Sequence, residues 1–142
     1  MEVKVCELKD LETVYDLVCN LKGEQLERKG FQKAYESKVG KGENHLILAV
    51  DEGAAVGFLS LSVSFHLHHA GKVATVEELI VTENSRGKGV GKMLMSSATE
   101  FAKEKKCEII ELASGFKRVD AHGFYEKIGF LKRGYNFEMA LR

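Results

Sequence analysis

Apolar residues recur along the first third of the chain with the spacing of α-helices. The clearest repeat consists of Leu11, Val14, Leu17, Val18 and Leu21. Asp10 can cap this helix at its start, and Gly23 can end it. A second helical pattern covers Glu24 to Val39, although Gly30 costs about 1 kcal/mol there relative to alanine. We therefore expect a short strand at Val3 to Val5 and then two helices, the second of them broken or mobile near its glycine.

Strict alternation of apolar and polar residues replaces the helical spacing in the middle of the chain. An apolar run at 46–50 and a turn at 51–53 precede Gly57 to Leu67, where apolar and polar residues alternate. This pattern indicates a hairpin with one apolar face. From Val73 to Val81 apolar residues occupy odd and even positions alike, which is typical of a central strand covered on both sides. Glu77 and Glu78 interrupt that strand, and we expect them to point to opposite faces.

The remaining pattern predicts a helix over 89–105, a strand over 109–113 and a short helix that ends at Gly129. Four apolar residues near the end of the chain then alternate with polar ones: Tyr135, Phe137, Met139 and Leu141. They predict a terminal strand. It can lie within its own sheet or pair with the edge of a neighbouring copy, which leaves a homodimer open. The order of elements describes one α/β domain over residues 1–142.

Composition narrows the classes of function. The 142 residues carry 21 Lys and Arg against 21 Asp and Glu, so no net field steers the protein to nucleic acid or an anionic membrane. No window approaches the ~20 apolar residues of a membrane span, and the first residues lack a signal-peptide core. We expect a cytoplasmic protein with neither nucleic acid nor membrane as partner. Three widely spaced cysteines, Cys6, Cys19 and Cys107, argue against a disulfide framework.

A glycine-rich basic loop, Arg86 to Lys92, lies between the central strand and the following helix. Free backbone N–H groups at a helix N-terminus bind oxyanions, and the glycines let the main chain approach a phosphate closely. The loop does not fit the Walker pattern, because Met93 stands where Ser or Thr would hold magnesium. Its glycine spacing also departs from the dinucleotide fingerprint. The pattern that fits is Arg-x-x-Gly-x-Gly over residues 86–91.

A second motif, A-x-x-F-Y-x-x-x-G-F, follows at Ala121 to Phe130. Together and in this order, the two motifs resemble those of the GNAT superfamily of acyl-CoA-dependent N-acyltransferases. The resemblance implies an α/β fold with a mixed, mostly antiparallel sheet flanked by helices. It also implies transfer of an acetyl group from acetyl-CoA to a primary amine of a small molecule or peptide, by direct attack in a ternary complex. The alternative is a non-catalytic acyl-CoA-binding or regulatory module.

The same resemblance assigns residues to acetyl-CoA. The central strand would hold the pantetheine arm and the loop the pyrophosphate. The assigned residues are Leu79, Ile80, Val81, Arg86, Gly87, Lys88, Gly89, Val90, Gly91 and Lys92. Two departures from the family pattern stand nearby: Arg118 replaces a frequent asparagine, and the loop lacks the proline common before its arginine.

Three residues are candidates for the chemistry. Tyr125 matches the family tyrosine that protonates the coenzyme A thiolate, although it could instead only pack in the core. By resemblance, a glutamate at the position of Glu77 takes the proton of the amine through water, and Glu78 is the fallback. A structural role for either carboxylate also stays open.

His66 and His68 share one face of the hairpin, with His69 adjacent. Histidines at i and i+2 can share a metal ion, but the sequence offers no evident third ligand. We therefore predict no metal and a solvated hairpin tip, with a role in the acceptor pocket as the alternative.

Overall fold

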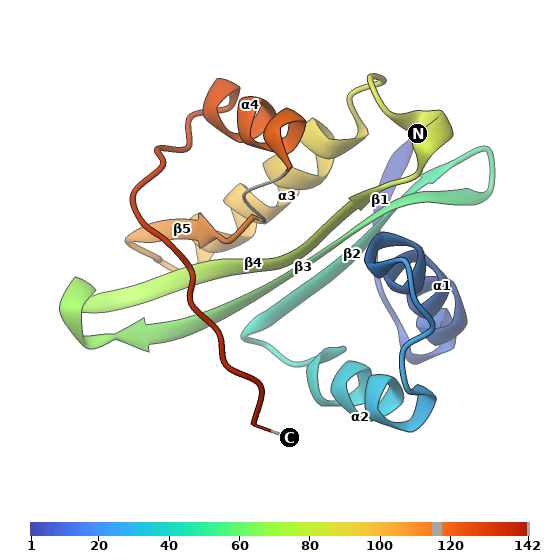
Figure 1. Cartoon of the computed structure of the whole chain (residues 1–142), viewed down its shortest axis with the longest axis horizontal. Coiled ribbons are helices and arrows are strands. Elements are labelled where there is room, and N and C mark those ends of the chain that lie inside the picture. Colours follow the sequence, from blue (N-terminus) through green and yellow to red (C-terminus); the bar gives the residue numbers. More distant parts are fainter. Residues whose placement is uncertain (115–117, 142) are drawn as a thin grey trace.

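The computed structural model describes residues 1–114 and 118–141, and its centre is a five-stranded sheet of order β1-β2-β3-β4-β5. The strands are β1 (Glu2–Val5), β2 (Asn44–Asp51), β3 (Ala54–His66), β4 (Gly71–Val81) and β5 (Ile109–Leu112). All neighbouring pairs are antiparallel except β4 and β5, which are parallel. The predicted mixed, mostly antiparallel sheet is therefore confirmed (Figure 1).

Helices cover both faces of this sheet. On one face lie α1 (Leu11–Lys22) and α2 (Arg28–Lys38), and on the other α3 (Val90–Glu104) and α4 (Val119–Lys127) (Figure 1). Two apolar cores result, one on each side. Ile80 of β4 packs with α1 and α2, whereas Ala74 and Val76 of the same strand pack with α3. The central strand is thus covered on both faces, as its continuous apolar run predicts.

Local signals set the ends of the first two helices. Gly23 ends α1 in the left-handed conformation at φ 71°. The second helix begins at Arg28 rather than Glu24, because the Glu27 carboxylate accepts hydrogen bonds from the backbone N–H groups of Lys29 and Gly30. Gly30 therefore lies in the capped first turn, and the helix continues unbroken through it. The expected break at this glycine is wrong.

A β-bulge separates two halves of β4. Ser60 of β3 pairs with Glu78, but the next residue, Leu61, pairs with Val76, so Glu77 is an extra residue on β4. The pairing of β4 with β5 ends close by, at Val76 and Leu112. Beyond that point the second half of β4, Glu77 to Val81, has an edge that β5 does not cover.

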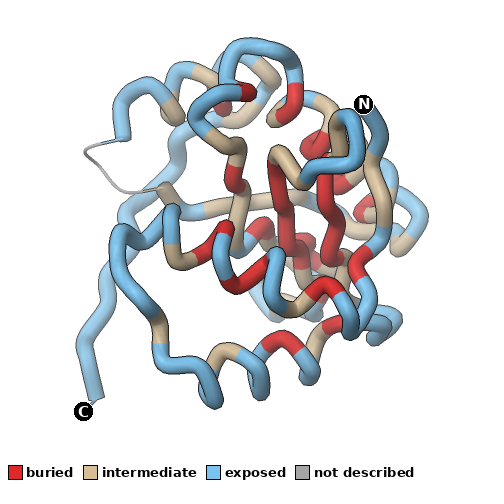
Figure 2. The backbone as a smooth tube through the Cα atoms, turned by 90° about the vertical axis from the view of Figure 1, so that its right-hand side faces the viewer, coloured by how far each residue is buried: buried red, intermediate tan, exposed pale blue. Residues whose placement is uncertain are grey.

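The predicted terminal strand is wrong. The structure assigns no strand to residues 135–141, and Tyr135, Phe137, Met139 and Leu141 are 83–92% exposed. This segment leaves α4 and runs along the outside of the molecule, exposed from residue 131 onward (Figures 1 and 2). Alternation specifies which face of a strand is apolar, but it does not supply the neighbouring strand that would pair with it.

Among the residues that the structure describes, no helix combines the length and apolar character needed to cross a membrane.

Candidate active site

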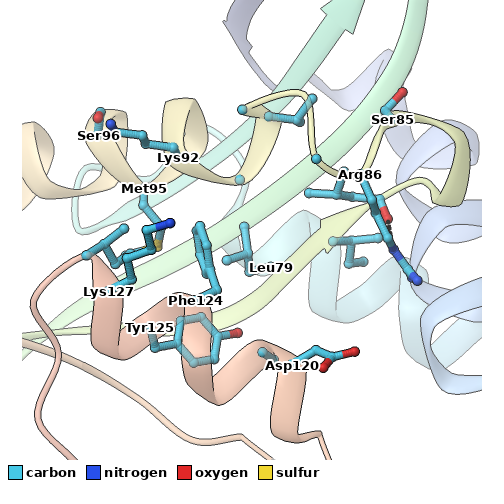
Figure 3. Close-up of a pocket in the computed structure, with 18 of the residues that line it drawn as sticks. Leu79, Ser85, Arg86, Lys92, Met95, Ser96, Asp120, Phe124, Tyr125 and Lys127 are labelled. Carbon is cyan, nitrogen blue, oxygen red and sulfur yellow. Dashed lines mark hydrogen bonds between the residues drawn. The ribbon is translucent and has the colours of Figure 1, made fainter.

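A cleft of about 1820 Å³ opens between the uncovered half of β4, the start of α3 and one side of α4. Figure 3 shows how these elements surround it: Leu79 enters from β4, Arg86 from the loop, Lys92 and Met95 from α3, and Tyr125 from α4. Segments separated by more than thirty residues in the chain therefore face one space. The cleft is long and open, which suits an extended ligand better than a compact one.

The loop gives this cleft an anion-binding end. Gly87 and Gly89 adopt φ values of 78° and 85°, which side chains other than glycine rarely adopt. Gly89 is the N-cap of α3, and the first helical hydrogen bond is donated by the Met93 N–H to the Gly89 carbonyl at 3.0 Å. The N–H groups of residues 90–92 precede that bond and have no acceptor within the helix. They are free to bind an oxyanion, which the helix dipole also favours.

Packing holds the loop and α4 close together. A Cβ atom at Gly91 would lie 3.2 Å from the ring of Phe124, so the absence of a side chain lets α4 approach α3. On the other side of the loop, the Arg86 Nε donates a 3.4 Å hydrogen bond to the Val81 carbonyl. The cation is thereby tied to the end of β4.

The structure brings most of the predicted acetyl-CoA residues together. All of them line the cleft except Lys88, which is exposed outside it: Leu79, Ile80, Val81, Arg86, Gly87, Gly89, Val90, Gly91 and Lys92. Since the edge of β4 is uncovered from Glu77 onward, backbone groups at alternate positions there can pair with an extended ligand, as they would with another strand.

Tyr125 lines the same cleft and is almost fully buried. Its ring contacts Phe124 and Phe130 edge to face, with centroids 5.6 and 6.1 Å away. The hydroxyl turns along the cleft toward the side of α4 that carries Asp120 (Figure 3). Burial raises the pKa of this hydroxyl, against an opposing effect of the Arg118 charge. The phenol therefore stays protonated to higher pH than an exposed tyrosine does.

Glu78 is held by a buried hydroxyl on the neighbouring strand. The Ser60 hydroxyl donates a short hydrogen bond to the Glu78 carboxylate and accepts one from the Glu78 N–H at 3.2 Å. Ser60 is 2% exposed and alternates with Leu59 and Leu61, which face α3, so it lies on the α1 and α2 side. The carboxylate is consequently fixed on that side of the sheet, next to the uncovered edge of β4.

Glu77 also lies on the α1 and α2 side, so the expectation that the two glutamates point to opposite faces is wrong. Its carboxylate forms a 3.1 Å ion pair with Lys38 of α2. The physical reason is the bulge, in which two consecutive side chains lie on the same side of the strand. Neither glutamate lines the cleft itself, although Leu79, which directly follows Glu78, does.

Several cleft residues were missed in the sequence. They are contributed by the second half of α1, by α3 beyond its first turn and by both ends of α4: Leu17, Asn20, Leu21, Ser96, Thr99, Lys103, Asp120 and Lys127. Nothing in the sequence indicated that the α1 residues line the cleft, because α1 is distant in the chain from the glycine loop and β4. Those on α3 were detectable in principle, since they repeat at helical spacing from the glycine loop.

Comparison with known proteins agrees with the fold. The model of the acetyltransferase (GNAT) family matches residues 11–130. An aminoalkylphosphonate N-acetyltransferase of Salmonella typhimurium is 35% identical over 96% of this chain and 92% of its own length. Glucosamine 6-phosphate N-acetyltransferase 1 of rice is 26% identical over 82% of this chain and 70% of its own length.

A solved structure has the same architecture throughout. The crystal structure of a protein described as a transcriptional regulator from Bacillus halodurans superimposes with a TM-score of 0.88, covers 99% of both chains and is 26% identical. The fold and cleft thus define an acyltransferase-like α/β protein. The chain belongs to the GNAT family of acetyltransferases.

Proposed function

We propose that this protein transfers an acetyl group from acetyl-CoA to the primary amine of a small molecule that also carries a phosphonate or phosphate group. The observation that carries the proposal is the cleft, in which free N–H groups at the start of α3, the open edge of β4 and Tyr125 face one another. The anionic class of acceptor rests on the relatives, which are described as acting on aminoalkylphosphonate and on glucosamine 6-phosphate.

Acetyl-CoA fits the residues present. Its pyrophosphate would lie against the N–H groups of residues 90–92 and beside Arg86, and its pantetheine arm along Leu79 to Val81. Glycine at 87 and 89 leaves open space where a Cβ would otherwise stand. The bound donor supplies an activated thioester, and the residues of the chain orient it.

The acceptor amine must lose a proton before it attacks. We assign this proton transfer to Glu78, directly or through a water molecule. Only one of its oxygens accepts the Ser60 hydroxyl, and the side chain is fixed at the strand edge where donor and acceptor would meet. Glu77 is the weaker candidate, because its carboxylate already forms an ion pair with Lys38 of α2.

Tyr125 would return a proton to the departing coenzyme A thiolate. Its raised pKa keeps the proton available through neutral and mildly alkaline pH. No acyl-enzyme is required in this scheme. Burial raises the pKa of the Cys107 thiol, which disfavours the thiolate that a covalent step would need, and Cys107 does not line the cleft.

Two measurements in sequence test the proposal. Calorimetry with acetyl-CoA should show one site per chain, and coenzyme A release should then be followed across an amine panel. The panel contains an aminoalkylphosphonate, glucosamine 6-phosphate, a polyamine and a peptide with a free N-terminus. We expect turnover with the phosphorus-containing amines. Binding without turnover on any amine would support the non-catalytic module, and absence of binding would contradict both functions.

A further inference from the structure

Three histidines gather at the tip of the β3–β4 hairpin, which we call the histidine tip and define as His66 to Gly71. His66 ends β3, and a single turn of 3₁₀ helix over Leu67–His69 follows. Ala70 closes the turn at φ 52°, with its N–H bound to the Leu67 carbonyl at 3.0 Å. Residues three apart in a 3₁₀ turn lie over one another, so the turn returns His69 to the side of His66.

The three imidazoles are close enough to share an ion. One ring nitrogen from each of His66, His68 and His69 lies within 4.8 Å of the other two. The ring centroids are separated by 5.6, 5.9 and 4.2 Å. Nitrogen ligands around a tetrahedral zinc ion, bound at 2.0–2.1 Å, lie about 3.3 Å apart. Rotation of partly exposed rings about their side-chain bonds can close the remaining gap of about 1.5 Å without movement of the backbone.

No competing partner holds these rings. Among residues 1–114 and 118–141, no hydrogen bond or ion pair engages His66, His68 or His69, and their ring contacts are with one another. Glu108 adds negative charge at the base of the tip, because its side chain packs where a Cβ at Gly71 would otherwise stand.

From this geometry we propose that the histidine tip binds one divalent transition-metal ion, such as Zn²⁺, through His66, His68 and His69. Neutral imidazole is a ligand well suited to zinc, nickel and copper, and three protein ligands leave a fourth position for water. The tip projects from the body of the sheet, so an ion can reach it freely (Figure 1).

The metal site is separate from the acyl-transfer cleft. Gly71 and Val81 are the two ends of β4, and ten residues of strand span about 33 Å. The cleft lies at the Val81 end and the histidine tip at the Gly71 end. The proposal therefore does not depend on the acetyl-transfer function, and it revises the expectation of a solvated, metal-free tip. The missing third ligand is His69, which only the turn geometry brings into place.

Zinc chloride titrated calorimetrically into the protein of residues 1–142, after treatment with EDTA and dialysis, tests the site. We expect one ion per chain with micromolar or tighter affinity. Each single substitution, His66→Gln, His68→Gln or His69→Gln, should weaken binding by about tenfold or more, and the triple variant should abolish it. His122→Gln on α4 is the matched control and should bind as the unaltered protein does.

Co²⁺ gives a second readout that identifies the ligands. Nitrogen ligation should produce visible d–d bands without a thiolate charge-transfer band, and the bands should vanish in the triple variant. Circular dichroism verifies that this variant folds, which the exposure of the tip leads us to expect. Equal zinc binding by the triple variant and the unaltered protein, or no binding by either, would overturn the proposal.

Discussion

The glycine loop, residues 86–92, and the two glutamates lie close together in the chain, but different interactions position them. Local backbone conformation shapes the loop: positive φ at Gly87 and Gly89 and the free N–H groups at the start of α3. A bulge, and partners on β3 and α2, position Glu77 and Glu78. A site formed by local conformation can be recognised from a short motif. The direction of a side chain that depends on strand pairing cannot be recognised in this way, because one inserted residue changes the face of the sheet to which the side chain points.

The largest expected effect is on the glutamate that the bulge and Ser60 hold in place. Glu78→Gln should lower kcat by roughly 10²–10⁴-fold, the usual contribution of general acid–base catalysis. Steady-state coenzyme A release measures the rate, and calorimetry should show an unchanged Kd for acetyl-CoA. Glu77→Gln is the matched control on the same strand and should retain most activity. The reverse ranking of these two variants would contradict the assignment.

A smaller loss of rate is expected for Tyr125→Phe, about 10²-fold in kcat, since water can partly replace the phenol as proton donor. Burial raises the pKa of Tyr125, so the protonated, active form persists to higher pH than for an exposed tyrosine. The kcat profile of the unaltered protein should therefore keep the contribution of this group to higher pH than an exposed tyrosine would allow. If kcat declines at alkaline pH in the Tyr125→Phe variant as well, the decline arises from another group.

On the loop side, Gly89→Val should weaken acetyl-CoA binding by roughly tenfold to a hundredfold. A β-branched residue at φ 85° stores about 1–3 kcal/mol of strain, which the loop relieves by shifting its N–H groups. Calorimetry measures the change. Gly40→Val introduces similar strain at φ 72° in the connection between α2 and β2, remote from the cleft. It should lower stability but leave acetyl-CoA affinity intact, and equal losses of affinity in both variants would refute a local role for Gly89.

The smallest effect should come from Lys38→Met, which removes the partner of Glu77. Both side chains of this ion pair are about one-third exposed, and such pairs contribute roughly 0–1 kcal/mol. Urea denaturation should show a change within that range, and kcat should stay within about threefold of the unaltered value. A decrease as large as that of Glu78→Gln would show that the ion pair itself takes part in the reaction.

The sequence predicted those elements of the fold that depend on residues near one another in the chain. Gly23 ends α1, alternation identifies β3, and the two-sided apolar run identifies β4. The errors have two causes. The helical pattern from Glu24 did not reveal that Glu27 caps α2, although this cap is a local contact with residues two and three positions later. The alternating C-terminal residues lie exposed, because the local pattern does not encode a partner strand.

The same distinction holds for the sites. The loop motif identified a stretch that lines the cleft apart from Lys88. It could not reveal Ser60 as the partner of Glu78, since the two strands join only through the hairpin. His69 was visible in the sequence, but its approach to His66 depends on a single 3₁₀ turn.

The most direct test of the proposed reaction compares two acceptors that differ only in the anionic group. Coenzyme A release from acetyl-CoA should be measured with an aminoalkylphosphonate and with the alkylamine of equal carbon chain length. We expect kcat/KM to be at least about a hundredfold higher for the phosphonate, which corresponds to roughly 2.7 kcal/mol of added transition-state stabilisation. Equal values would contradict the proposed acceptor class, and no release from either amine by protein that binds acetyl-CoA would contradict small-amine acetylation itself.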